Sequence, residues 1–479
     1  MRVEVPMISY HSSEDGKSDR IMAVDCHPDA SETSVTFLTV GGGGGEGDVR
    51  IWHVAEGQSP RYCSSLRKGH DGSVNCGRWA PEGSRVASAG DRGAVCVWSG
   101  GSSASWWRSL DENDERATCS KLAHADDVYD VAWSPCGEYL LTGAIDHTAA
   151  LWHVGTKRRV RVISDHAHYV QGVAFDPRGE CFATQSSDKT VRVYDEDWKK
   201  AAGKVLKFWD SDDKRHAVFA NELQHAGFFR RLGFATDGEL LVAPAALAAP
   251  GWEDHKTGAV AFARGEAARG PCAYYPAPDG QASVVKASPV LFDAGTRSLF
   301  ALAFRDAVAV YDVAAPNPLL LVRGLHRAAL TDLAWSNDAS MLVVASGDGY
   351  LSFLKFSPDD LGRPDPPSRK LNIARGPPAD PTPEPSPAKQ ITMLVAREKP
   401  ELEDYETFDQ LPASTPVKKK YSQPIDLAGD DDHHHHRAAA AAAAENVRLG
   451  DHHTNGQPAR GSNNKKKRRI APTLVADAA

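Results

Sequence analysis

The sequence predicts an all-β protein: a seven-bladed β-propeller followed by a disordered, low-complexity C-terminal tail. Two observations support this. A strand-rich unit recurs along residues 1–363, and proline-rich, charged sequence replaces it from residue 364 onward. The composition, 41% hydrophobic and 25% charged, is ordinary for a globular domain. We therefore expect one large domain with an extension.

The repeat is clearest in two neighbouring copies, residues 124–154 and 166–195. Equivalent residues lie 42 positions apart, as in His124 and His166 or Asp146 and Asp188. A period of about 40–45 residues is typical of a WD repeat, in which each copy forms one four-stranded propeller blade. Pro-x-Gly turns separate segments of alternating apolar residues, as expected for short antiparallel strands.

Seven copies of this unit follow one another, and the fifth and sixth are the weakest. Radial stacking of the copies buries faces that no single blade could bury alone. The opening segment RVEVPMIS precedes the first full copy, and we expect it to supply the missing outer strand of the last blade. The copies cover residues 21–54, 69–98, 124–154, 166–195, 228–264, 288–313 and 326–356.

A histidine, a threonine, an aspartate and an aromatic residue recur in each good copy. They could be read as a catalytic relay, but such a relay occurs once per site, whereas this set returns with the blade. We therefore predict a structural hydrogen-bond network. In the second copy Asp91 lies seven residues before Trp98 instead of six, so the network there is expected to be incomplete. The predicted network residues are His124, Thr142, Asp146, Trp152, His166, Thr184 and Asp188.

Charge and cysteine content narrow the class of protein. The net charge of −8 does not favour nucleic acid as the main ligand, and no apolar run is long enough for a membrane span. The first residues lack the apolar core of a secretory signal. None of the eight cysteines forms a CxxC pair, which favours buried free thiols in the cytosol or nucleus over a disulfide or zinc framework.

Insertions interrupt the repeat at residues 100–119 and 196–224. Trp106 and Trp107 lie in the first, where they either anchor a partner or pack back onto the propeller. Residues 41–45 are consecutive glycines, read as a hairpin insertion because a phosphate-binding loop would need a following Lys-Ser/Thr and a helix. No cofactor site is predicted.

Residues 364–464 form a predicted disordered linker, because they hold too little apolar sequence to build a core. Ser386 and Thr415 precede proline and match sites of proline-directed kinases. Four histidines at 433–436 could catch a metal ion in solution, but nothing fixes a coordination geometry, so no metal site is predicted.

The last segment, residues 465–479, begins KKKRRIAPTLV and is basic first and apolar afterwards. Its basic half is typical of a nuclear localisation signal, made of Lys465, Lys466, Lys467, Arg468 and Arg469. Apolar side chains follow at Ile470, Leu474 and Val475. Such a segment suits β-augmentation, in which its backbone pairs with the sheet edge of a partner.

At this point the sequence resembles a known family, the WD-repeat middle subunit (the B subunit) of chromatin assembly factor one, and more distantly the histone-regulator WD-repeat family. The resemblance covers nearly all of residues 1–363. It is carried by VYDVAW, DHTAALW, YVQGVAFDP, SGDGYLSF and FFRRLGF, and the last most favours the assembly-factor subunit. RRIAPTLV is similar to the motif with which both relatives dock on the anti-silencing-factor histone chaperone. The docking positions carried over are Arg468, Arg469, Ile470, Pro472 and Leu474.

The resemblance implies a nuclear, non-enzymatic subunit of a histone chaperone complex that assembles nucleosomes on replicated DNA. Its partners would be the large and small subunits of the complex, the anti-silencing chaperone and core histones three and four. Neither a membrane nor a specific DNA sequence would be bound. The alternatives are a generic WD-repeat adaptor, such as a ubiquitin-ligase substrate receptor, the replication-independent histone-regulator subunit and, least favoured, an enzyme.

Overall fold

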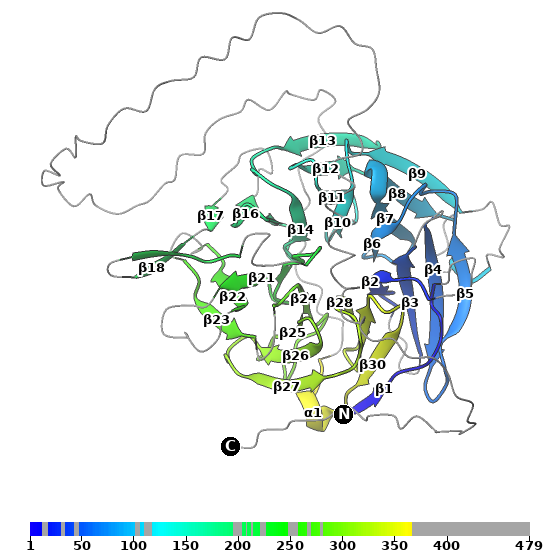
Figure 1. Cartoon of the computed structure of the whole chain (residues 1–479). Coiled ribbons are helices and arrows are strands. Elements are labelled where there is room, and N and C mark those ends of the chain that lie inside the picture. Colours follow the sequence, from blue (N-terminus) through cyan, green and yellow to red (C-terminus); the bar gives the residue numbers. More distant parts are fainter. Residues whose placement is uncertain are drawn as a thin grey trace, which may run out of the picture. The chain divides into compact units, whose positions relative to one another are not determined.

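A computed structural model describes most of residues 1–365 and shows a ring of blades around a central axis (Figure 1). The chain passes through seven four-stranded sheets in order, which confirms the predicted seven-bladed β-propeller. The described ranges are 1–11, 18–29, 34–42, 47–100, 106–109, 117–194, 204–206, 208–211, 214–220, 227–247, 257–265, 270–277 and 281–365.

The first four blades follow the strand order of a meander, with the first strand of each innermost and the last outermost. Blade one contains β2 (Ile21–Cys26), β3 (Ser34–Gly41), β4 (Asp48–Ala55) and β5 (Arg61–Leu66). Blade two contains β6 (Val74–Trp79), β7 (Arg85–Gly90), β8 (Ala94–Ser99) and β9 (Thr118–Ala123). Blade three contains β10 (Val128–Trp133), β11 (Tyr139–Ala144), β12 (Ala149–His153) and β13 (Arg158–Ile163). Blade four contains β14 (Val170–Phe175), β15 (Phe182–Ser186), β16 (Thr190–Tyr194) and β17 (Lys204–Leu206).

The remaining blades keep this order despite their weaker sequence signal. A separate hairpin of β18 (Phe208–Ser211) and β19 (Lys214–Ala217) precedes blade five. Blade five contains β20 (Gly233–Phe234), β21 (Leu240–Leu247), β22 (Thr257–Ala263) and β23 (Ala273–Pro276). Blade six contains β24 (Val284–Ala287), β25 (Leu299–Ala303), β26 (Ala307–Asp312) and β27 (Pro318–Arg323). Blade seven contains β28 (Leu330–Trp335), β29 (Met341–Ser346) and β30 (Leu351–Lys355), followed by the short helix α1 (Pro358–Leu361).

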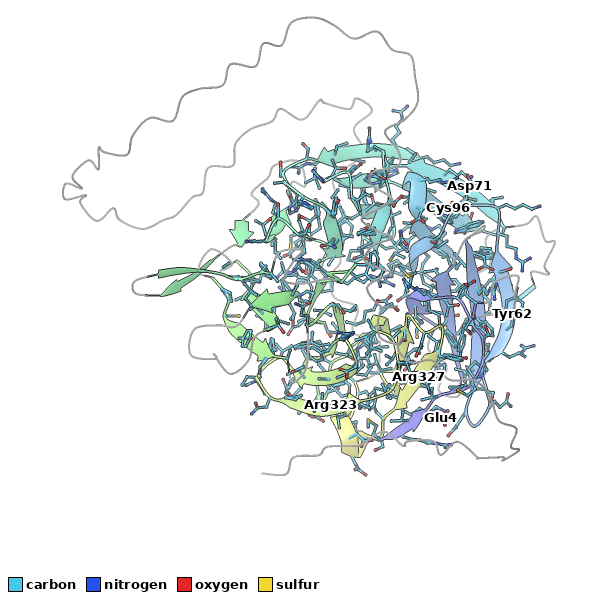
Figure 2. All side chains as sticks on the ribbon, in the orientation of Figure 1. Glu4, Tyr62, Asp71, Cys96, Arg323 and Arg327 are labelled. Carbon is cyan, nitrogen blue, oxygen red and sulfur yellow. The ribbon has the colours of Figure 1, made fainter. Side chains whose placement is uncertain are left out.

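The ring is closed by the N-terminal strand, as predicted. Strand β1 (Arg2–Glu4) pairs antiparallel with β30, with Val3 opposite Leu354, and so forms the outermost strand of blade seven. Glu4, labelled at the rim in Figure 2, forms an ion pair with Lys355 at 2.9 Å. Because the first and last strands share one sheet, neither leaves an open edge at the junction of the chain ends.

The hydrophobic core is divided into seven clusters, and each one joins two neighbouring blades. Between blades two and three, for example, Val97 and Leu122 of one sheet pack with Val131, Trp133 and Trp152 of the next. Equivalent clusters fill each of the six remaining interfaces around the ring, including the one between blades seven and one. Each blade is therefore stabilised by its neighbours rather than by a core of its own.

The turn between the first and second strands of a blade recurs with one backbone geometry. Gly137 has a φ of 73° and its amide donates to the carbonyl of Ser134 at 2.9 Å. Glycine suits this turn because a positive φ carries little steric cost without a Cβ atom. In blade seven Ala339 occupies the same position with a φ of 56°, so the degraded repeat keeps the turn at the cost of some strain.

Three predictions about local structure need correction or completion. Blade six begins with β24 at Val284, earlier than the repeat unit placed at residues 288–313, because residues 288–298 form the connection between its first two strands. The glycine run starts at the last residue of β3, which pairs with β4, as expected for a hairpin connection. Trp106 and Trp107 are only 5% and 1% exposed, so they pack onto the propeller and are not available as anchors.

All eight cysteines are free, but the prediction that they are buried is wrong for most of them. Cys76 and Cys96 are buried, five are half-buried and Cys272 is exposed. Cys63 and Cys119 lie in the outermost strands β5 and β9, and Cys26 is the last residue of β2. The other three cysteines that are not buried, Cys136, Cys181 and Cys272, lie in connections between strands, where side chains are more accessible. Among the described residues, no helix is both long and apolar enough to span a membrane.

Candidate functional site

The recurring polar residues form a continuous hydrogen-bonded chain within each well-conserved repeat. In blade three His124 Nδ1 lies 3.4 Å from Asp146 Oδ2, and His124 Nε2 lies 2.6 Å from Thr142 Oγ1. The indole of Trp152 donates to the same hydroxyl at 3.0 Å. The chain is satisfied when the carboxylate accepts from Nδ1–H, since Nε2 then accepts the hydroxyl proton. It ties the loop before the innermost strand to the second and third strands.

Blade four repeats this arrangement with a different aromatic residue. His166 Nδ1 lies 2.9 Å from Asp188 Oδ2, and Nε2 lies 2.7 Å from Thr184 Oγ1. Tyr194 takes the place of tryptophan, and its hydroxyl donates to Asp165 at 3.3 Å. The contacts from aspartate to histidine to threonine are thus the same in both blades, as a folding device requires, and only the partner of the aromatic residue differs.

Sequence comparison missed the members of this network in the first and last blades. In blade one His11 contacts Thr39 at 3.0 Å and Asp48 at 3.1 Å, and Trp52 donates to Thr39 at 3.1 Å. His11 lies before the residues assigned to the first repeat, so the insertion between them hid the relation. In blade seven the hydroxyl comes from the third strand and not the second. There His326 contacts Ser352 at 2.8 Å and Asp348 at 3.2 Å, without a tryptophan.

Blade two lacks the carboxylate contact. His70 Nε2 lies 2.7 Å from Ser88 Oγ, to which Trp98 also donates at 2.8 Å. Asp91 instead accepts from the side-chain amide of Asn75 at 3.1 Å, and His70 Nδ1 is buried with no hydrogen-bond partner. The altered spacing between Asp91 and Trp98 thus accompanies a broken chain.

Replacing Thr142 by valine is expected to lower the free energy of unfolding by about 2–4 kcal/mol, because it leaves His124 and Trp152 buried without their shared partner. Denaturant unfolding of the full chain measures the loss. The control is Thr156→Val, which removes an exposed hydroxyl and is expected to change the stability by less than about 0.5 kcal/mol. Equal losses in the two variants would contradict a structural role for this network.

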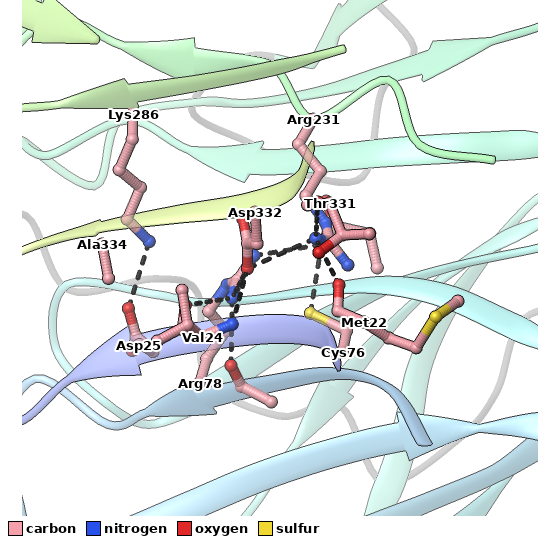
Figure 3. A network of polar contacts seen from close by, with 12 residues as sticks. Met22, Val24, Asp25, Cys76, Arg78, Arg231, Lys286, Thr331, Asp332 and Ala334 are labelled. Carbon is pink, nitrogen blue, oxygen red and sulfur yellow. Dashed lines mark hydrogen bonds and ion pairs between the residues drawn. The ribbon is translucent and has the colours of Figure 1, made fainter. Parts of the chain in front are cut away.

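A second polar group lies at the centre of the ring, where the innermost strands meet. We call it the channel cluster; it comprises Arg78, Asp130, Arg231 and Asp332 (Figure 3 shows Arg78, Arg231 and Asp332). Arg78 binds Asp332 at 2.6 Å, and Arg231 lies 3.3 Å from both Asp130 and Asp332. Two cations face two anions, so the cluster is electrically balanced. The two arginine side chains hold the pKa of the buried Asp332 carboxyl below its usual value against the opposing effect of burial.

Arg231 connects blade five to four other blades. Its guanidinium donates to the backbone carbonyls of Met22, Asn75 and Thr331 at 3.2, 2.9 and 2.9 Å, and it pairs with Asp130 of blade three. The side chain is 2% exposed and stacks over the ring of Phe229 with 3.7 Å between the guanidinium carbon and the ring centre. This is the physical role of the FFRRLGF stretch: it delivers a buried cation across the channel.

The approach of that stretch to blade four explains one glycine. The amide of Arg230 donates to the carbonyl of Gln171 at 3.1 Å, which brings the two backbones together at Gly172. A Cβ atom at position 172 would overlap the carbonyl group of Arg230. Any larger residue there would push the arginine segment away from the axis.

Carboxylates also link the innermost strands of successive blades through the backbone. The amides of Val24, Trp79 and Val173 donate to Asp332, Asp25 and Asp130, each in the preceding blade, at 3.1, 2.9 and 3.0 Å. Charged side chains at the axis therefore hold the ring closed in addition to forming ion pairs.

A cavity of about 390 Å³ opens at the end of the channel where the innermost strands finish. Its wall combines aromatic and small apolar side chains with charged ones, among them the channel cluster and the ion pair of Lys286 with Asp25 at 3.1 Å. The thiol of Cys26 also lines it, and burial together with the charge of Asp25 raises the pKa of that thiol. The aromatic lining residues are Trp79, Trp133, Phe175 and Phe234.

The chemistry available at this cavity is binding. Its charged groups are paired with each other, and its one thiol is held in the protonated, weakly nucleophilic form. In the ranges that the structure describes, no group of three or more histidine, cysteine or acidic side chains is placed to hold a metal ion.

Comparison with known proteins identifies the relatives of this fold. Residues 1–361 match the model of a family described as the CAF1B/HIR1 β-propeller domain. The chain belongs to this family. The match spans the whole ring, from the closing strand β1 to helix α1.

Several relatives carry the family name in full. The B subunit of chromatin assembly factor 1 from Gallus gallus is 31% identical over 355 residues, 66% of this chain and 62% of the relative. The chromatin assembly factor 1 subunit FAS2 homolog of Oryza sativa is 30% identical over 76% of this chain and 74% of the relative. Protein HIR1 of Mycosarcoma maydis is 29% identical over 75% of this chain and 35% of its own length. The chain thus spans about 62% of the length of the first of these relatives.

The predicted tail sites of this family member lie outside the described residues. They are the docking positions Arg468, Arg469, Ile470, Pro472 and Leu474, the basic residues Lys465, Lys466 and Lys467, and the candidate phosphorylation sites Ser386 and Thr415. The channel cluster lies within the described residues, but the sequence analysis did not predict it. The signal that could have indicated it is FFRRLGF, in which two adjacent arginines stand among apolar residues and the second is Arg231.

Proposed function

We propose that this chain is the non-enzymatic propeller subunit of a nuclear histone chaperone complex that assembles nucleosomes on newly replicated DNA. The observation that carries the proposal is the family match over residues 1–361, together with relatives named as the B subunit of chromatin assembly factor 1. A non-catalytic role is supported by the repeated use of its polar residues in folding contacts. The propeller, residues 1–363, would be a rigid platform for the large subunit of the complex.

The segment at residues 465–479 would recruit a second partner, the anti-silencing-factor histone chaperone. In this proposal Arg468 and Arg469 contact an acidic rim, while Ile470, Pro472 and Leu474 fill apolar pockets beside a sheet edge. The residues between, 364–464, act as a linker and carry Ser386 and Thr415 as candidate phosphorylation sites. Histones three and four would reach the complex through the chaperone or by direct contact.

The recruitment step is tested by capture of the purified chaperone on the full-length chain. Ile470→Ala is expected to weaken capture by at least about tenfold, since burial of such a side chain contributes roughly 1.5–3 kcal/mol. Arg469→Ala is expected to weaken it as well. The matched controls are Leu449→Ala and Arg448→Ala, which truncate an aliphatic side chain of the same size and an arginine elsewhere in the tail. Equal capture of the motif variants and the unaltered chain would refute the docking proposal.

A second candidate function is favoured by the relatives named Protein HIR1, which are 28–29% identical over 75% of this chain. In that case the chain would serve a replication-independent histone regulator. Purification of the native complex and identification of its subunits by mass spectrometry separates the candidates. Recovery of the large subunit of chromatin assembly factor supports the first, and recovery of ubiquitin-ligase subunits alone would favour a generic adaptor instead.

A further inference from the structure

Acidic and aromatic side chains gather on the face of the propeller opposite the cavity. All seven innermost strands run in the same sense, so the residues just before them share one face. Asp126 and Asp127 precede β10, Tyr169 precedes β14 and Phe228 precedes β20. The turn that holds Asp91, between β7 and β8, opens on this same face. We call the set Asp91, Asp126, Asp127, Tyr129, Tyr169 and Phe228 the acidic–aromatic patch.

Phe228 is the exposed centre of this patch. Its side chain is 41% exposed, and among the described residues it is the only aromatic side chain in the exposed large hydrophobic set. The neighbouring Phe229 and Arg231 are buried, so the chain turns one phenylalanine of FFRRLGF inward and leaves the other in solvent. The ring of Phe228 is therefore available for contact with a partner, and its value as a binding surface depends on the groups that surround it.

Other rings extend the patch toward blades three and four. The rings of Tyr129 and Phe228 lie 6.4 Å apart in an edge-to-face arrangement. Next to them, the exposed imidazole of His147 stacks on His168 at 5.3 Å, and His168 contacts Tyr169 at 4.3 Å. These contacts hold the rings in place, so little conformational freedom would be lost when a partner binds.

Negative charge is concentrated beside these rings. Burial and the neighbouring carboxylates of Asp91 and Asp126 raise the pKa of Asp127. Burial, followed by the carboxylate of Asp127, raises the pKa of the Tyr129 hydroxyl. Three carboxylates face one cation, Arg92, whose amide donates to Asp127 at 2.7 Å. The patch therefore keeps a net negative charge, which a cationic partner would offset.

We propose that the acidic–aromatic patch docks an extended, arginine-bearing segment of a partner protein. A guanidinium group would stack on Phe228 and Tyr129 while it pairs with Asp126 and Asp127. This combination is one that arginine satisfies, because its planar cation both stacks on rings and forms forked hydrogen bonds with carboxylates. The inference goes beyond the proposed function, since it assigns a binding face and a ligand chemistry without depending on the complex to which the chain belongs.

The test uses the full-length chain and a short fluorescent peptide of arginine, leucine and alanine. A comparison peptide has glutamine in place of each arginine. In fluorescence anisotropy, Asp126→Asn with Asp127→Asn is expected to weaken binding by about tenfold. Asparagine keeps the acceptors for the amides of Arg92 and Asp127, so the fold is retained. Phe228→Ser is expected to weaken it by about three- to fivefold. The affinity of the unaltered chain should fall as salt is added.

Matched controls are Leu319→Ser, which removes another exposed apolar side chain, and Asp359→Asn, which removes an exposed carboxylate far along the sequence. Both are expected to bind like the unaltered chain. The proposal is overturned if the controls lose as much affinity as the patch variants, or if the glutamine peptide binds equally well. The proposal is also overturned if deletion of residues 465–479 raises the affinity of the unaltered chain for the arginine peptide severalfold. That result would show that the basic tail of the chain itself occupies the patch.

Discussion

Replacement of Arg231 by methionine is expected to destabilise the propeller by about 3–5 kcal/mol, because it leaves buried carboxylates without a counter-charge. Asp130 and Asp332 are 3% and 0% exposed, and Arg78 alone cannot balance both. The backbone carbonyls of Met22, Asn75 and Thr331 would also lose a donor. The substitution would remove contacts that join five of the seven blades.

Urea unfolding of the full chain, followed by tryptophan fluorescence, measures this effect. Arg231→Lys keeps the charge but loses the planar fork, so an intermediate loss is expected. The control is Arg2→Met, which breaks an exposed pair with Glu4 and should cost less than about 1 kcal/mol. If Arg231→Met proves as mild as the control, the channel cluster does not hold the ring together.

A second large effect is expected on acidification, and it begins with buried histidines. Burial, assisted by Lys121, lowers the pKa of His70 from 6.5 to about 4, and burial also lowers the pKa of His166. Both are neutral in the folded protein at neutral pH, whereas the unfolded chain takes up protons below its own histidine pKa. The stabilisation is complete above about pH 6.5 and is lost as the pH falls toward 4. For His70 alone the loss is about 3 kcal/mol.

Aspartates of the repeated network act in a lower pH range. Burial raises the pKa of Asp48, Asp146 and Asp348, but hydrogen bonds from their histidines and from other neighbouring donors outweigh it and hold each pKa at about 2. Their contribution is present above the unfolded value near 3.9 and disappears as the pH falls through about 2. Unfolding at low pH should therefore have two components.

Urea midpoints at a series of pH values from about 7 to about 2 separate the two components. His70→Gln is expected to flatten the dependence between about pH 6.5 and 4, because glutamine does not titrate. His147→Gln, at an exposed position, is the control and should follow the unaltered curve. An unchanged slope for His70→Gln would show that this histidine does not contribute to the acid sensitivity.

Much of the fold could be predicted from local pattern alone. The 42-residue offset between His124 and His166 and the strand-like start of the chain indicated both the blades and their closure. The network of blade three could be predicted because its members lie within one repeat. His11 could not be assigned, since its distance from the rest of blade one does not match the period. Ser352 could not be predicted for another reason. Its hydroxyl lies on the third strand of blade seven and not on the second, so it does not occupy the position of Thr142 in the repeat.

The sequence by itself determined the number of blades, the closing strand and the family to which the chain belongs, because each depends on spacing along the chain. Only the tertiary structure decided that Arg231 meets Asp130 and Asp332, that Trp106 and Trp107 are buried, and that Phe228 is exposed while Phe229 is not. The reason is closure of the ring. A closed propeller brings the innermost strands of distant blades to one axis, and no periodicity in the sequence encodes which side chains meet there.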